Sequence, residues 1–118
     1  MTKLLATTTL LLTLLVSPIL AEALSMDDLV KRDGLYYKKF TDVPFSGEVS
    51  GLGKGKFEEG KKNGKWMYFY NNGQLYGKGN YKNGKENGVW EWYSKSGEFS
   101  ERWTYKDGIE DGPFEWYW

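Results

Sequence analysis

The chain of 118 residues contains no cysteine and no histidine. These absences exclude disulfide bonds, thiol nucleophiles, metal sites built from cysteine and histidine, and catalysis by an imidazole base. The formal net charge is zero, so the chain as a whole has no general attraction for nucleic acid or for an anionic membrane. We therefore expect no metal, no other cofactor and no nucleic-acid partner, and the length favours one small domain.

Aromatic residues and glycine, by contrast, are abundant. The chain is 18% aromatic and has 15 glycines, both well above the average for globular domains. Aromatic side chains favour strands and glycine favours tight turns. The composition therefore predicts an all-β chain with many turns.

The N-terminal 23 residues differ from the rest. A basic start at Lys3 precedes an apolar run over residues 4–16, and the small-residue pattern Ala21-Glu22-Ala23 follows. This order is typical of a secretory signal peptide, here a signal helix over residues 1–23 with cleavage after Ala23. The run is shorter than the roughly 20 apolar residues that a transmembrane anchor needs. A buried N-terminal helix is the alternative interpretation of these residues. The signal peptide predicts that the protein is exported, to the periplasm or out of the cell.

A 24-residue period dominates the sequence after residue 56. Aromatic and glycine columns recur at this offset: Phe57/Tyr81/Tyr105, Gly60/Gly84/Gly108, Gly64/Gly88/Gly112, Trp66/Trp90/Phe114 and Tyr68/Trp92/Trp116. A fixed period in this range is typical of repeat architectures, in which each unit packs against the next. Alternation within residues 66–70 predicts a strand, and Asn71-Asn72-Gly73 predicts the turn after it.

These patterns predict an elongated single-layer sheet of tandem β-hairpins. We expect a lead-in segment over residues 24–34 and a repeat domain over 35–118, divided into a degenerate first unit (35–56), two repeats (57–80 and 81–104) and a partial unit (105–118). The second strands of the two repeats are expected at about 75–81 and 99–105. Residues 114–118 are expected to form the first strand of a third hairpin. Either this hairpin is a truncated copy, or its unpaired edge predicts edge-to-edge association with another chain, including self-association.

Residues 81–93 carry a family resemblance. They read Tyr-Lys-Asn-Gly-Lys-x-x-Gly-x-Trp-x-x-Tyr, and residues 105–117 repeat the pattern loosely. This pattern resembles the bacterial MORN repeat, in particular that of the YwqK-type antitoxin family, over about residues 35–118. The resemblance implies a ribbon of β-hairpins that contacts proteins or lipids and has no catalytic residues. The antitoxin family implies binding and neutralisation of a partner protein.

Two patterns in the sequence bear on catalysis. Residues 55–61 match the G-x-x-x-x-G-K core of a P-loop, but Lys62 stands where serine or threonine should hold Mg²⁺, and a strand follows in place of a helix. Glu91 and Glu115 share one repeat column and could form a carboxylate pair of the glycosidase kind. A ladder of solvated carboxylates is the commoner explanation of such a column. We therefore expect no catalytic residues and no enzymatic activity.

The candidate binding residues depart from the repeat columns, lie near turns or carry positive charge. The columns of Trp66 and Tyr68 are expected to form the core, whereas Trp103 stands where Gly55 and Gly79 stand in earlier units. Residues 31–85 hold twelve Lys or Arg against five Asp or Glu, and residues 86–118 hold three against eight. Exposed aromatic residues are the usual anchors of binding surfaces. The candidate surface comprises Tyr70, Tyr76, Trp103, Trp118, Lys61, Lys62, Lys82 and Lys85.

Three functions fit these features. The first is an exported, non-enzymatic repeat module that binds a protein or another component of the cell envelope. The second is an antitoxin or immunity protein, and the third is a carbohydrate- or peptidoglycan-binding protein. The expected partner is a protein, with an envelope lipid or glycan as the alternative.

Overall fold

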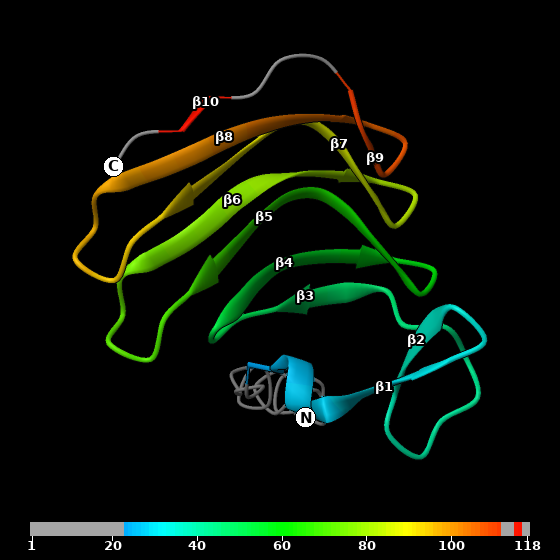
Figure 1. Ribbon diagram of the computed structural model, residues 1–118. Coiled ribbons are helices and arrows are strands. Elements are labelled where there is room, and N and C mark those ends of the chain that lie inside the picture. The colour runs from blue at the N-terminus through cyan, green and yellow to red at the C-terminus, as the bar shows by residue number, and fades with distance from the viewer. Residues whose placement is uncertain (1–22, 112–114, 117–118) are drawn as a thin grey trace, which may run out of the picture.

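The computed structural model describes residues 23–111 together with the backbone of residues 115 and 116 (Figure 1). The described chain is all-β, as expected, and its one helical element is the 3₁₀ turn η1 (Met26–Asp28). The predicted signal helix, apart from residue 23, lies outside the described residues, as do Phe114 and Trp118.

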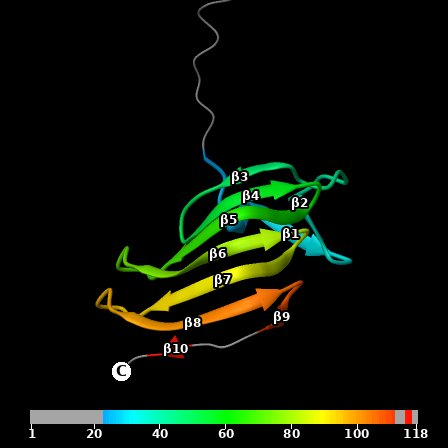
Figure 2. The same ribbon diagram turned by 90° about the horizontal axis from the view of Figure 1, so that it is seen from above.

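The strands form two antiparallel sheets. The small sheet pairs β1 (Leu29–Arg32) with β2 (Leu35–Lys38). The main sheet has the order β3-β4-β5-β6-β7-β8-β10, with β9 also paired to β8 (Figure 2). Its strands are β3 (Gly47–Val49), β4 (Gly53–Glu58), β5 (Lys61–Phe69), β6 (Leu75–Lys82), β7 (Lys85–Tyr93), β8 (Phe99–Lys106), β9 (Ile109–Glu110) and β10 (Glu115–Trp116). Strands β3 to β8 thus lie side by side in chain order, and β6 and β8 confirm the strands expected at 75–81 and 99–105.

Short turns join the strands at one end of the sheet. Asn83-Gly84 connects β6 to β7 with φ of 52° and 83°, and Asp107-Gly108 follows β8 with φ of 51° and 83°. A positive φ at both turn residues is the property of a type I′ hairpin, which asparagine, aspartate and glycine tolerate best. The same dipeptide chemistry, Asp33-Gly34, joins β1 to β2.

The core lies on one face of the main sheet, which we call the inner face and define by Trp66, Tyr68, Trp90 and Trp92. Trp66 and Trp90 are wholly buried, and Tyr68 and Trp92 pack against the buried cluster. These contacts confirm a core function for the described members of both aromatic columns.

Two glycines make room for the buried indoles. A Cβ atom on Gly55 would lie 2.3 Å from Cδ2 of Trp66, and one on Gly79 would lie 2.1 Å from Cδ2 of Trp90. Both distances are far below van der Waals contact, so no larger residue fits under either ring without displacement. The rings therefore lie directly over the backbone of the preceding strand.

The N-terminal segment covers the inner face over β4 and β5. The strands arch, and η1 and β1 lie on the concave side (Figure 1). The ring centroid of Tyr36 is 5.0 Å from that of Phe57, and the Tyr36 N–H donates to the Gly60 carbonyl at 2.9 Å. Ser25 and Asp28 form a capping box around η1. Residues 24–34 therefore contain ordered structure that closes this end of the core.

Candidate functional site

A series of ring contacts continues along the inner face from the buried core toward β6. Trp90 and Trp92 stack with centroids 5.6 Å apart, Trp92 and Tyr76 are 5.3 Å apart, and Tyr76 and Tyr70 are 5.0 Å apart. The Tyr70 hydroxyl donates to the Tyr93 carbonyl at 2.7 Å, which fixes the last ring of the series. The aromatic side chains here are held in place by one another and by the sheet.

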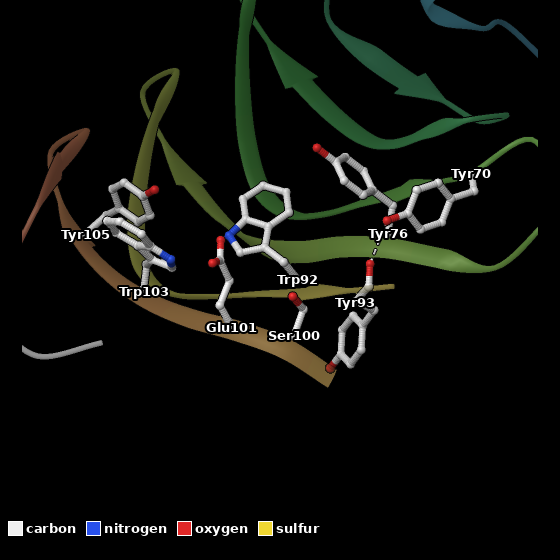
Figure 3. A pocket seen from close by; sticks show the side chains of 8 residues that line it. All are labelled: Tyr70, Tyr76, Trp92, Tyr93, Ser100, Glu101, Trp103 and Tyr105. Atoms are coloured by element: carbon white, nitrogen blue, oxygen red, sulfur yellow. Dashed lines mark hydrogen bonds between the residues drawn. The ribbon is translucent and has the colours of Figure 1, made fainter. Parts of the chain in front are cut away.

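The last three rings of this series, those of Trp92, Tyr76 and Tyr70, line an open depression of about 360 Å³ over β6, β7 and β8 (Figure 3). Tyr76 keeps 42% of its surface exposed at the edge of the depression. Figure 3 shows the Glu101 carboxylate between the rings of Trp103 and Trp92. The described lining comprises Tyr70, Tyr76, Trp92, Tyr93, Ser100, Glu101, Trp103 and Tyr105. The site is therefore an aromatic surface with one carboxylate and one aliphatic hydroxyl.

The depression exists because β8 differs from β6 at two inner-face positions. Across β6 and β7, Gly77 pairs with Trp92, and a Cβ on Gly77 would lie 2.4 Å from Cε3 of that ring. Across β7 and β8, Trp92 pairs with Glu101, and Trp90 pairs with Trp103. The two glycine positions that receive neighbouring rings in β6 thus carry side chains in β8. These side chains form one wall of the depression.

Three of the residues expected from the sequence lie together in this depression: Tyr70, Tyr76 and Trp103. Sequence reasoning missed Glu101, although a signal was present, because Glu101 occupies the column of Gly53 and Gly77. It also assigned Trp92 to the core alone. Trp92 serves both purposes, because it packs on Trp90 and lines the depression.

Lys62 lies elsewhere on the inner face, inside an aromatic enclosure. Its Nζ atom donates to the Tyr68 hydroxyl at 2.8 Å and lies 5.0 Å from the Trp66 centroid and 5.1 Å from the Tyr81 centroid. Burial is the largest cause of the lowered pKa of this ammonium group, followed by the positive charge of Lys31. Lys62 is therefore half-buried and used within the fold.

The other three lysines of the candidate surface lie at the short-turn end of the sheet, where Lys82 pairs with Lys85. All three are exposed. Lys61 lines a second depression with Glu58, Glu59 and Asn83. The structure thus separates Lys61, Lys82 and Lys85 from the aromatic depression.

Glu91 is fully engaged in polar contacts beside β8. Its carboxylate accepts from Nη2 of Arg102 at 2.9 Å and Nε at 3.1 Å, accepts from the Tyr93 hydroxyl at 3.0 Å, and lies 3.8 Å from Nζ of Lys78. The hydrogen bonds from Arg102 are the main cause of the lowered pKa of Glu91. The backbone register places Glu115 opposite Arg102, and its side chain lies outside the described residues. Glu91 has the environment of a structural ion pair.

A scan against family models and searches of curated proteins and of solved structures gave no match to this chain. Within residues 23–111, no group of three or more histidine, cysteine, aspartate or glutamate side chains is arranged to hold a metal ion. Over the same part of the chain, no helix is long and apolar enough to span a bilayer. The chemistry of the depression has to be derived from its own residues.

Proposed function

We propose that this chain is an exported, non-enzymatic binding module that engages a protein partner through the aromatic depression on its inner face. The observation that carries the proposal is the contrast along this face. Residues 24–38 cover it over β4 and β5, whereas the rings over β6 to β8 line an open depression. A few residues supply most of the binding energy at protein interfaces, and tryptophan and tyrosine are enriched among them.

We also propose that the scaffold of this module consists of tandem 24-residue hairpin units of the MORN type. Supporting it, β5 and β7 each have nine residues, and the indole N–H groups of Trp66 and Trp90 each donate to a carbonyl ten residues earlier. Export follows from the signal-peptide pattern of residues 1–23. N-terminal sequencing of the mature protein tests that part, and we expect it to begin near residue 24.

Photo-cross-linking in cells tests the binding surface. Tyr76 is replaced by p-benzoylphenylalanine in the full chain, and Ile109 is replaced in the same way as a control, because it is 71% exposed on β9 and outside the depression. We expect a discrete cross-linked protein from position 76 and none from position 109. A second substitution, Trp103→Ala, should reduce the yield at position 76. Equal yields at both positions, or none at position 76, would contradict the proposal.

A glycan is the second candidate partner, and the composition of the depression is the observation that favours it. Sugar rings stack on aromatic faces, and Ser100 and Glu101 supply hydroxyl and carboxylate groups beside Trp92. The cross-linked product from position 76 distinguishes the two candidates. If protease treatment changes the gel mobility of the product, the partner is a protein. If a muramidase changes it, the partner is a peptidoglycan fragment. Sequencing a protein product also tests whether the partner is a toxin, as the antitoxin alternative requires.

A further inference from the structure

Lys62 shows how this fold holds an ammonium group against its aromatic inner face. The Nζ atom is 5.0 to 5.3 Å from the ring centroids of Trp66, Tyr81 and Tyr68, and it donates a hydrogen bond to the Tyr68 hydroxyl. A cation at this distance is attracted by the negative faces of the rings, more strongly where water is displaced. The β5–β6 hairpin therefore contains an enclosure for a lysine side chain, filled by its own lysine.

The β7–β8 hairpin has aromatic residues at the equivalent strand positions and the opposite charge at the lysine position. Lys62 is the second residue of β5, and Glu86 is the second residue of β7. At the strand positions that hold the enclosing rings of the first hairpin, the second has Trp90, Trp92 and Tyr105. The second hairpin thus has a carboxylate where the first supplies an ammonium group.

The depression also contains a carboxylate. Among its eight described lining residues, Glu101 is the one acidic side chain, and none is basic. Burial raises the pKa of the neighbouring Tyr105 hydroxyl, and the negative charges of Glu86, Glu110 and Glu101 raise it further. Three carboxylates therefore act on this tyrosine, and one of them, Glu101, lines the depression itself.

We propose that the depression binds the side chain of a lysine residue in the partner polypeptide, with the ammonium group at Glu101 and the alkyl chain over the rings of Trp92 and Trp103. This assignment rests on the proposed function and specifies the chemistry of the partner. An ammonium group would gain a charge-assisted hydrogen bond to the carboxylate in addition to the ring faces. A neutral side chain of similar length would lack both the ion pair with the carboxylate and the attraction of a cation to the ring faces.

Titration of the full chain with matched peptides tests the assignment. The probes are acetyl-Gly-Ser-Lys-Ser-Gly-amide, the same peptide with Nε-acetyl-lysine, and the same peptide with glutamate. Binding is followed through the indole N–H resonances of the tryptophans by NMR. We expect the lysine peptide to shift the Trp92 and Trp103 resonances, and the acetylated peptide to bind about 10-fold more weakly. The Trp66 resonance should not move, because Lys62 already fills its enclosure.

Two charge-neutralising variants make the test specific. Glu101→Gln should weaken the binding of the lysine peptide by about 5- to 10-fold. Glu98→Gln changes the net charge equally at an exposed turn residue and should leave the affinity unchanged. Unchanged far-UV circular dichroism shows that both variants fold.

Three results would overturn the lysine assignment: equal binding of the lysine and acetyl-lysine peptides, equal effects of the two variants, or no response of Trp92 to any peptide. The Tyr76 cross-link decides the proposed function separately. A cross-linked protein combined with equal binding of the two peptides would retain the protein-binding surface and reject its preference for lysine.

Discussion

The close packing of Trp90 on the backbone of β6 makes Gly79→Ala the most informative substitution in the fold. The added methyl carbon would lie 2.1 to 2.5 Å from three atoms of the indole. Since both the ring and the β6 backbone are held by neighbouring strands, either the ring must tilt away or the two strands must separate. The perturbation therefore tests directly whether ring-on-glycine contacts hold the sheet together.

The size of the effect follows from the contacts that the ring would lose. Overpacking a well-filled core costs about 1–3 kcal/mol. Tilting the ring would also break the hydrogen bond from the Trp90 indole N–H to the Asn80 carbonyl, 3.1 Å long, at a cost of about 1 kcal/mol. We expect Gly79→Ala to lower the free energy of unfolding by about 3 kcal/mol, or the melting temperature by roughly 12–20 °C for a domain of this size.

Urea unfolding followed by tryptophan fluorescence measures this loss, with Gly53→Ala as the matched control. A Cβ on Gly53 would meet its nearest atom, Cγ of Met26, at 3.4 Å, so we expect a change below about 0.5 kcal/mol. In a Trp90→Ala background, the cost of Gly79→Ala should fall to the level of the control, because the clashing ring is gone. If Gly79→Ala is no more destabilising than Gly53→Ala, the packing argument is refuted.

Two further predictions concern pH. Burial, the largest cause, raises the pKa of Tyr68 above 10, so the folded chain keeps this proton where the unfolded chain loses it, and stability falls as the pH rises above about 10. Tyr68→Phe should reduce this alkaline loss. At pH 7 it should cost about 1–2 kcal/mol because Lys62 loses its acceptor, whereas Tyr76→Phe at an exposed ring should leave the stability at pH 7 unchanged. Hydrogen bonds from Arg102 lower the pKa of Glu91 in the folded chain. Their contribution to the free energy of unfolding is therefore present above about pH 4.5 and is lost as the pH falls through the lowered pKa of the folded chain. Glu91→Gln should flatten the acid dependence and cost about 0.5–1 kcal/mol at pH 7, since the pair is partly exposed. Urea titrations from pH 2 to 11.5 measure both effects, and parallel curves for variant and parent would contradict either assignment.

The hairpins could be predicted from the sequence because their signals are local. Alternating aromatic residues specify a strand face over two or three residues, and Asn71-Asn72-Gly73 specifies the turn between β5 and β6. The boundaries of β6 and β8 therefore agree with the expected ranges to within one residue. The strand predicted at 66–70 begins earlier than expected, because β5 starts at Lys61, directly after a two-residue turn. The cover over β4 and β5 was not predictable, because it depends on contacts such as that between Tyr36 and Phe57, which are distant in sequence.

The same distinction applies to the site. Trp103 can be recognised in the sequence as a large residue in a glycine column, and it lines the depression. Glu101 also departs from a glycine column, but its place in the site depends on the strand register, which puts it opposite Trp92. The sequence places Lys62 with the exposed lysines, because its burial among tyrosine and tryptophan rings arises only when two strands, β5 and β6, meet the N-terminal cover.

Hydroxyl-radical footprinting of the full chain, free and in an extract of the compartment to which it is exported, tests the central claim most directly. We expect oxidation of Tyr76 and Trp92 to fall in the extract, because the partner covers the depression. Oxidation of Phe40, a fully exposed ring outside the depression, should stay the same and serves as the control. Protection of Phe40 with continued oxidation of Tyr76 and Trp92 would contradict the assignment of the inner face over β6 to β8 as the binding surface.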